Sequence, residues 1–353
     1  MSNMYGRHFR YLTFGESHGK AVGCVIDGIR PGIDIDEASI QKLLDKRRPG
    51  QSKFTTQRAE SDTLDILSGV FNGKTTGHPI CIVIWNKDAQ SKHYENIKNL
   101  FRPGHADYTF FKKYGIRDYR GGGRQSARVL AANVAAGAIA KKQLEKLGVS
   151  IVAYVKQIGA VKAKKIDLKQ IGKNPFYCPD KEAAKKMERL ISRIRAGGDS
   201  AGCLIEAIVT GVPVGLGSPQ ANKLNAEIAK ALMSINAAKA VEIGAGFDVM
   251  GMVGSKNNDI FIRKGEKIVT RTNNSGGILG GISNGMPIVA RVAIKPASSI
   301  HREQKTVDIK GKAVSFRVMG RHDPVPGIRG VPIVEAMLAS VIYDAYLEYK
   351  AEK

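Results

Sequence analysis

The positions of apolar residues along the chain predict a mixture of strands and helices. Short runs rich in valine and isoleucine predict strands near residues 22–27, 79–85, 149–161, 203–214, 286–294 and 313–318. Longer stretches with apolar residues at helical spacing predict helices at about 36–46, 126–148, 180–196 and 332–349. Strands and helices do not alternate regularly, so the pattern indicates an α+β fold rather than a parallel doubly wound sheet.

Residues that commonly begin or stop helices stand at the ends of these segments. Asp36 and Ser126 are candidate N-caps, because their side-chain oxygens can accept the first backbone N–H groups of a helix. Gly148 fits the position after the second helix, and Pro332 fits the first turn of the last one. No repeat and no linker-like change in composition interrupts the order. We therefore expect a single domain over residues 1–353.

Length and charge narrow the class of protein. The 353 residues include 55 Lys and Arg against 32 Asp and Glu, a net charge of +23. This charge favours an anionic partner, either a nucleic acid, an acidic lipid surface or a phosphorylated metabolite. Base-stacking aromatic residues are scarce at 7%, with one Trp, so we do not expect a nucleic-acid partner. No long apolar run and no signal-peptide-like start is found, which predicts a cytoplasmic protein without a membrane span.

The composition also disfavours several kinds of site. The four cysteines are scattered and form no CxxC pair, so we expect free thiols rather than a zinc site or disulfides. Carboxylates do not cluster, which argues against a metal site and against a paired-carboxylate hydrolase. The glycines at 244–251 and 276–285 do not spell GxGxxG, so a Rossmann dinucleotide site is not expected.

The segment GESHG, residues 15–19, matches the G-x-S-x-G pattern of hydrolase nucleophile elbows. An elbow needs strands before it and a helix after it, whereas a strand-like stretch follows this segment, so the hydrolase interpretation fails. Two interpretations of Ser17 and His18 remain equal on spacing alone. They lie either in a functional loop or in a polar turn between two strands.

Two basic loops have the composition of an anion-binding site. Residues 45–58 place five cations around a Pro-Gly turn, although a solvated basic loop is the common alternative. Residues 101–128 combine five arginines with His105 and with the glycines 121–123 before the expected helix. Glycines let backbone N–H groups approach a ligand, and a helix N-terminus favours negative charge, so we interpret this loop as functional. The GK[ST] ending of a P-loop is missing, which disfavours triphosphate hydrolysis.

Two loops in the C-terminal part are ambiguous. The glycine-rich residues 274–300 could lie against a planar ring, and Lys295, Ser298 and Ser299 could bind a phosphate, but taken alone this stretch is better explained by tight turns in a β-rich region. Residues 320–332 place a cation, a base and an acid side by side in a proline-rich loop. Neighbouring His and Asp often only bond to backbone, so function and structure have equal weight there.

Together and in this order, these loops resemble those of chorismate synthases along nearly the whole chain. The stretches that carry the resemblance are GESHG with IDG and PG, RRPG…TTQR, FRPGHADYT, YRGGGRQSAR, SINA, GGILGGIS, KPASSI and GRHDP…EAM. The resemblance implies a β-α-β sandwich with helices packed between antiparallel sheets, assembled as a homotetramer. It is far more specific than any one motif.

The resemblance also implies an activity. Chorismate synthases eliminate phosphate from 5-enolpyruvylshikimate 3-phosphate (EPSP) in an anti 1,4-elimination that gives chorismate, the seventh step of the shikimate pathway to aromatic amino acids. Reduced FMN (FMNH2) is required without net redox change, because the C6 hydrogen is not acidic enough for an ordinary side-chain base. NADP and FAD are further terms associated with the family. The sequence contains no recognisable reductase module, so we expect an external flavin reductase to supply the reduced FMN.

Residue roles follow from the same resemblance. His18 would be the acid toward the departing phosphate, His105 would protonate or hold the reduced flavin, and Asp323 would take the proton from flavin N5. Both histidines would act near neutral pH, where imidazole titrates. The substrate's anionic groups would be bound by Arg47, Lys53, Arg102, Arg128 and Arg321, with Arg48 and Arg58 as secondary candidates. The flavin would lie along Arg124, Gln125, Ser126, Ala127, Asn236, Ala237, Gly280, Lys295, Pro296, Ala297, Ser298, Ser299 and Arg321.

The sequence departs from the family pattern in a few places. Val129, Leu130 and Asn133 replace the usual Glu, Thr and Arg. We expect no effect on the chemistry, because these positions fall inside the helix rather than at its anion-facing start. Lys53 stands where many relatives have Arg, which keeps the charge but loses bidentate geometry. A relative that binds FMN without turnover is disfavoured because the two histidines and the aspartate of the preceding paragraph are all present.

Overall fold

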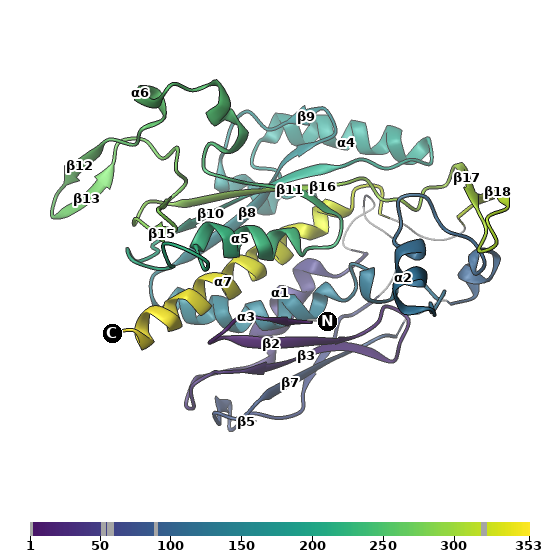
Figure 1. Ribbon diagram of the computed structural model, residues 1–353, viewed down its shortest axis with the longest axis horizontal. Helices are drawn as coiled ribbons and strands as arrows, with labels where there is room; N and C mark the ends of the chain where they lie inside the picture. The colour runs from purple at the N-terminus through teal and green to yellow at the C-terminus, as the bar shows by residue number, and fades with distance from the viewer. Residues whose placement is uncertain (1–2, 51–53, 55–59, 88–90, 319–322) are drawn as a thin grey trace.

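Two antiparallel sheets enclose a layer of helices, as Figure 1 shows. The computed structural model describes residues 3–50, 54, 60–87, 91–318 and 323–353. The first sheet has the order β1 (Met4–Tyr5), β2 (Arg10–Gly15), β3 (Ala21–Asp27), β7 (Ile80–Trp85), β4 (Leu64–Ile66). The second has the order β11 (Ala238–Ile243), β16 (Ile288–Ile294), β10 (Cys203–Thr210), β8 (Ser150–Ile158), β9 (Val161–Lys162). This arrangement confirms the predicted β-α-β sandwich and its α+β class.

Short hairpins extend from this framework. They are β5 (Val70–Phe71) with β6 (Lys74–Thr75), β12 (Phe261–Lys264) with β13 (Lys267–Thr270), β14 (Ile278–Leu279) with β15 (Ile282–Ser283), and β17 (Glu303–Val307) with β18 (Ala313–Arg317). The β12–β13 hairpin projects away from the body of the molecule in Figure 1. The β17–β18 hairpin is tied to the segment before α2 (Asp107–Tyr114), because Phe101 N donates to Val307 O at 3.2 Å.

The middle layer contains α1 (Glu37–Arg47), α3 (Leu130–Lys146) and α7 (Val331–Ala351), with α5 (Leu224–Met233) packed beside α7. The helices α3 and α7 have buried residues on nearly all of their faces, as expected for helices within a core. Gly137 allows their close packing, because a Cβ there would lie 2.5 Å from the backbone oxygen of Ala336. The stretch Pro326–Ala351 is long and apolar enough to cross a membrane, but 78% of its most apolar window is buried inside the fold. Its apolar character therefore follows from its place between the sheets.

The predicted elements are all present, with ends that differ from the predicted ones by a few residues at most. The six strands correspond to β3, β7, β8, β10, β16 and β18, and the four helices to α1, α3, α4 (Lys181–Ala196) and α7. Asp36 caps α1 by accepting the N–H of Ser39 at 2.6 Å, and Gly148 follows α3 with a φ of +77°. Among the elements that the sequence pattern missed are β2, β11, α2 and α5.

The prediction that Ser126 begins the second helix is wrong, because α3 begins at Leu130. Ser126 has an extended backbone, and its hydroxyl accepts the N–H of Arg128 at 3.2 Å. Residues 123–125 just before it already form a 3₁₀ turn. The serine hydroxyl therefore caps a local turn instead of the helix. Short polar side chains often form such local hydrogen bonds to the backbone.

Asp180 is a buried N-cap that holds α4 in place. Its carboxylate accepts backbone N–H groups of Lys165, Lys164, Glu182 and Ala183 at 3.0–3.1 Å. These bonds, that of Lys165 first, lower the pKa of Asp180 to about 2. The ionised carboxylate therefore stabilises the fold above about pH 4, and this contribution is lost as the pH falls from there towards 2. We expect Asp180→Ala to lower the free energy of unfolding by about 1–2 kcal/mol at pH 7.

Urea unfolding of Asp180→Ala and the unchanged protein at pH 7 and pH 3 measures this contribution. The difference between the two proteins should shrink at the lower pH. Asp167→Ala is the matched control, because Asp167 is an exposed cap that accepts Lys169 N at 3.0 Å. An equally large loss in the control, or a difference that does not change with pH, would contradict the interpretation.

Candidate active site

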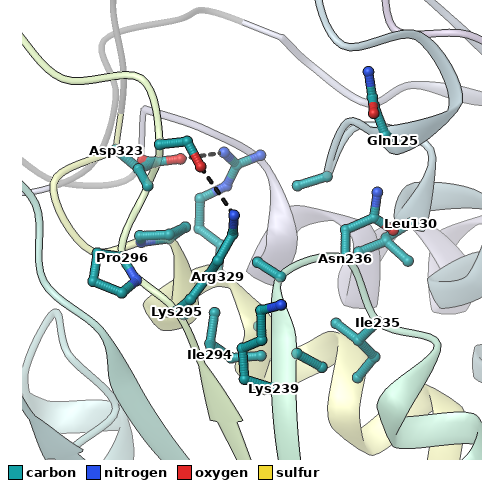
Figure 2. Close-up of a pocket in the computed structure, with 18 of the residues that line it drawn as sticks. Gln125, Leu130, Ile235, Asn236, Lys239, Ile294, Lys295, Pro296, Asp323 and Arg329 are labelled. Atoms are coloured by element: carbon teal, nitrogen blue, oxygen red, sulfur yellow. Dashed lines mark hydrogen bonds and ion pairs between the residues drawn. The ribbon is translucent and has the colours of Figure 1, made fainter. Parts of the chain in front are cut away.

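A cavity of about 510 Å³ opens where the second sheet meets the loops before α2, α3 and α7, and Figure 2 shows its lining. This volume is within the range of small-molecule and cofactor sites. Most of the residues that the resemblance assigned and that the structure describes are brought together here. Those that line the cavity are Arg47, His105, Gln125, Ala127, Asn236, Ala237, Lys295, Pro296, Ala297, Ser298 and Asp323.

The cavity combines apolar walls with cationic groups. Leu130, Ile235 and Ile294 form part of the apolar wall. Lys295 donates to the carbonyl of Gly104 and to the hydroxyl of Ser298, the latter at 3.0 Å. Burial lowers the pKa of Lys295, and the nearby charge of Lys239 lowers it further. Flat apolar surface beside ammonium and hydroxyl donors is what a flavin ring with a phosphate tail requires, so the residues present fit that group.

His105 reaches the cavity from a buried charge cluster centred on Asp107. Asp107 Oδ2 accepts Arg102 Nε at 2.8 Å, and Oδ1 lies 2.8 Å from Arg117 Nη1 and 2.9 Å from His105 Nδ1. Burial would raise the pKa of Asp107, but the hydrogen bonds from Arg102 and His105 outweigh it and lower this pKa. Burial lowers the pKa of the His105 imidazole, and the hydrogen bond with Asp107 opposes that shift. Asp107 thus orients the ring and supports its protonated form.

His18 lies on the other side of Arg102 from His105. It belongs to the turn between β2 and β3, so GESHG is a polar turn between strands, and its ring stands edge-on to Tyr94 with centroids 5.1 Å apart. Gly121 has a φ of +74° and packs against His18, because a Cβ there would lie 2.3 Å from its Cδ2. Arg102 Nη2 contacts both Gly121 O, at 3.3 Å, and His105 Nδ1, at 3.0 Å. Gly121 therefore lies between Arg102 and His18, and His18 does not line the cavity.

Asp62 neutralises two buried guanidinium groups. It lies 3.3 Å from Arg47 Nε and forms a very short ion pair with Arg128 Nη1. Arg128 also donates to Asn86 Oδ1 at 2.7 Å, and Arg47 donates to the carbonyl of Arg128 at 3.2 Å. All three charged side chains are almost fully buried. Arg47 lines the cavity, whereas Arg128 holds the loop behind it.

Asp323 stands at the wall of the cavity in an ion pair. Arg329 Nη1 donates to Asp323 Oδ2 at 2.7 Å, and Arg329 Nε donates to the carbonyl of Arg47 at 3.0 Å. Figure 2 shows the Asp323 carboxylate facing the guanidinium of Arg329.

Other assigned residues lie elsewhere or outside the description. Arg124 turns away from the cavity and donates to the carbonyl of Gly15 and to Thr13 Oγ1, at 2.9 and 2.8 Å. Gly280 lies in the turn between β14 and β15. The cavity lining does not include these two residues or Arg48, Arg102, Ser126, Arg128 and Ser299. Lys53, Arg58 and Arg321 lie outside the described residues. The roles assigned to all of them stay predictions.

Sequence reasoning missed several residues of this site. Asp107 lies in the basic loop 101–128, and its position two residues after His105 was the one feature of the sequence that could have indicated a role beside that histidine. Asp62 and Lys239 stand in no motif that points to a site, and Arg329 lies in the loop 320–332 but was not among the residues assigned there. Each is placed at the site by contacts with other segments of the chain, which the sequence alone does not reveal.

The departures from the family pattern at Val129, Leu130 and Asn133 are buried at the start of α3. Asn133 donates to the hydroxyl of Tyr11 at 3.3 Å within the core. The expectation that all three positions lie away from the site is wrong for Leu130, which lines the cavity. The reason is the later helix start, which makes Leu130 the first residue of α3 rather than an interior one.

Known proteins similar to this chain share one description. Residues 9–347 match the family model described as chorismate synthase. The chain is 54% identical over 355 residues to a chorismate synthase of Pelagibacter ubique (strain HTCC1062), with 99% of each covered. A solved structure described as a crystal structure of chorismate synthase has a TM-score of 0.79 and 33% identity, and the match covers 98% of this chain and 93% of that one. The chain belongs to the chorismate synthase family.

Proposed function

We propose that this chain catalyses the anti 1,4-elimination of phosphate from EPSP to give chorismate, and that the cavity of Figure 2 is where it does so. Family membership supports the reaction. The observation that carries the site is the convergence of His105, Lys295 and Asp323, which come from distant segments, on one cavity with apolar walls. A polyanionic substrate also accounts for cationic side chains inside the fold, without a nucleic-acid partner.

In this proposal some residues of the cavity bind the flavin and the substrate, and others transfer protons. Reduced FMN, when bound, supplies an electron to the substrate and recovers it, so no strong side-chain base is needed at C6. Lys295 and Ser298 would bind its phosphate, and Gln125 and Asn236 would contact its polar edge. Asp323 would accept the proton from flavin N5, and His105 would protonate or hold the reduced flavin. Guanidinium groups, Arg47 first, neutralise the anions of the substrate.

His18 protonates the departing phosphate in this proposal. Its place against Gly121, whose carbonyl accepts from Arg102, supports that role. An imidazole can donate a proton to a departing oxyanion and regain one from solvent. The resemblance assigns further substrate contacts to Lys53, Arg58 and Arg321, and these complete the proposed anion-binding set.

The surroundings of the enzyme are part of the proposal. We infer reduced FMN as the flavin, an external reductase as its source, a homotetramer as the assembly and the cytoplasm as the compartment. The segment from η4 (Gly246–Gly251) to β13 supports assembly, because it exposes Phe247, Met250, Phe261 and Ile268, which subunit contacts would cover. Four free cysteines suit a reducing compartment.

An anaerobic assay with EPSP and chemically reduced FMN tests the function. Chorismate and phosphate should be released in equal amounts, and oxidised FMN should give neither product. Folded protein that binds reduced FMN but forms no chorismate would contradict the proposal. If the protein instead bound nucleic acid with an affinity that falls steeply with salt, and showed no turnover, it would be a nucleic-acid-binding protein rather than this enzyme.

A further inference from the structure

Asp323 forms an ion pair with the guanidinium of Arg329, a residue that the sequence did not assign to the site. Arg329 belongs to η5 (Pro326–Gly330), the short helix that leads into α7. Its Nη1 lies 2.7 Å from Asp323 Oδ2, and the two side chains are only 15% and 14% exposed. Its Nε donates to the carbonyl of Arg47 at 3.0 Å. One guanidinium therefore binds both the carboxylate at the cavity wall and the last residue of α1.

Both anchors of this guanidinium are firm. The carbonyl of Arg47 is one of the last of α1, which leaves it without a partner within the helix and favours a cation there. The η5 helix packs tightly on the second sheet, because a Cβ on Gly327 would lie 2.1 Å from Cys203 Sγ. Only a planar fork with several donors can bind a carboxylate and a carbonyl in two fixed directions.

We propose that Arg329 is a positioning residue, which fixes the orientation of the Asp323 carboxylate toward the ligand in the cavity. This inference rests on the proposed function, in which Asp323 accepts the flavin proton. The other charged groups that line the cavity within the described residues are Arg47, His105, Lys239 and Lys295, and they come from different elements. Loss of Arg329 would leave the cavity cationic but would let the Asp323 side chain rotate away from its working direction.

The substitution Arg329→Met tests the proposal, because methionine keeps much of the side-chain volume without the fork. We expect kcat in the anaerobic assay to fall by about 10- to 100-fold, the size of effect that a misplaced catalytic group produces. The KM for EPSP and the Kd for reduced FMN should change by less than about threefold, because Arg329 mainly sets a direction. The matched control is Arg10→Met, since Arg10 is exposed and binds Asp27 Oδ2 at 2.6 Å and the carbonyl of Arg7 at 3.3 Å. The control should keep the rate of the unchanged enzyme.

A double-mutant cycle separates positioning from a merely structural role. Asp323→Asn should keep flavin binding and lose most turnover, and Asp323→Asn/Arg329→Met should be no slower than Asp323→Asn within about twofold, because the two residues act as one unit. Multiplied losses, a parallel loss of flavin binding or full turnover in Arg329→Met would overturn the proposal. Full turnover in Asp323→Asn would instead overturn the proposed role of Asp323. If Arg329→Met does not fold, Arg329→Lys replaces it in the cycle, with the same expectation and a smaller loss.

Discussion

Replacing Asp62 by asparagine should lower the free energy of unfolding by about 3–5 kcal/mol, the cost typical of removing one partner from a buried ion cluster. Asp62 is fully buried and is the carboxylate shared by Arg47 and Arg128. An asparagine keeps the shape but carries no charge, so the two guanidinium groups would lose the negative charge that they share in a low-dielectric interior. The loop of Asp62 connects α1 to the first sheet, so the loss would spread to the cavity wall at Arg47.

Urea unfolding at pH 7 measures this effect, with Asp27→Asn as the control. Asp27 also pairs with an arginine, Arg10, at 2.6 Å, but both side chains are exposed. Solvent and salt screen such a pair, so the control should leave the unfolding midpoint nearly unchanged. Equal midpoints for Asp62→Asn and the control would show that the buried cluster does not stabilise this fold.

The sheets could be predicted from the sequence better than the chain between them. β10 and β16 are rich in β-branched residues and pair along nearly their whole length, from Cys203 with Ile294 to Val209 with Ile288. In β2 the buried positions are Tyr11 and Thr13, between exposed ones, and this alternation is too short and polar to stand out. The helix α2 has Asp107 as its only buried residue. An ion cluster rather than an apolar face holds it, so hydrophobic periodicity cannot detect it.

The site could be predicted as a set of residue types but not as a set of partners. Arg102, Arg124 and Arg128 look equivalent in one basic loop. The structure gives them different tasks, because the first binds Asp107, the second binds the strand β2 and the third binds Asp62. These choices depend on which distant segments the sandwich brings together. The resemblance identified residues that line the cavity. A local motif cannot identify the residues from other segments that orient those side chains.

The substitution Asp107→Asn should have a large effect on activity. We expect chorismate formation to fall by about 10³-fold, by analogy with the loss of the orienting aspartate from a Ser-His-Asp triad. Asp107 Oδ1 lies 2.9 Å from His105 Nδ1, so the carboxylate can accept the proton on Nδ1 and set the state of Nε2. The amide of asparagine can present a donor instead, which favours the opposite tautomer of His105.

The pH profile separates this effect from a general loss of structure. Burial lowers the pKa of His105 and Asp107 opposes that shift, so Asp107→Asn should lower this pKa further. If protonated His105 is required, activity declines as the pH rises through its pKa, and the decline should occur at lower pH in the variant. The measurement is kcat between about pH 5.5 and 8.5 with saturating reduced FMN. Asp27→Asn is the control, because Asp27 pairs with Arg10 at 2.6 Å and both side chains are exposed.

A second substitution decides whether Asp107 acts through His105. The change His105→Ala should by itself remove the group that Asp107 orients. The double variant with Asp107→Asn should then be no slower than His105→Ala alone, because the two residues form one unit. A further loss in the double variant, with an unchanged pH profile in Asp107→Asn, would mean that Asp107 serves only the buried ion pairs of Arg102 and Arg117. The charge cluster would then hold the loop in place without directing the proton of His105.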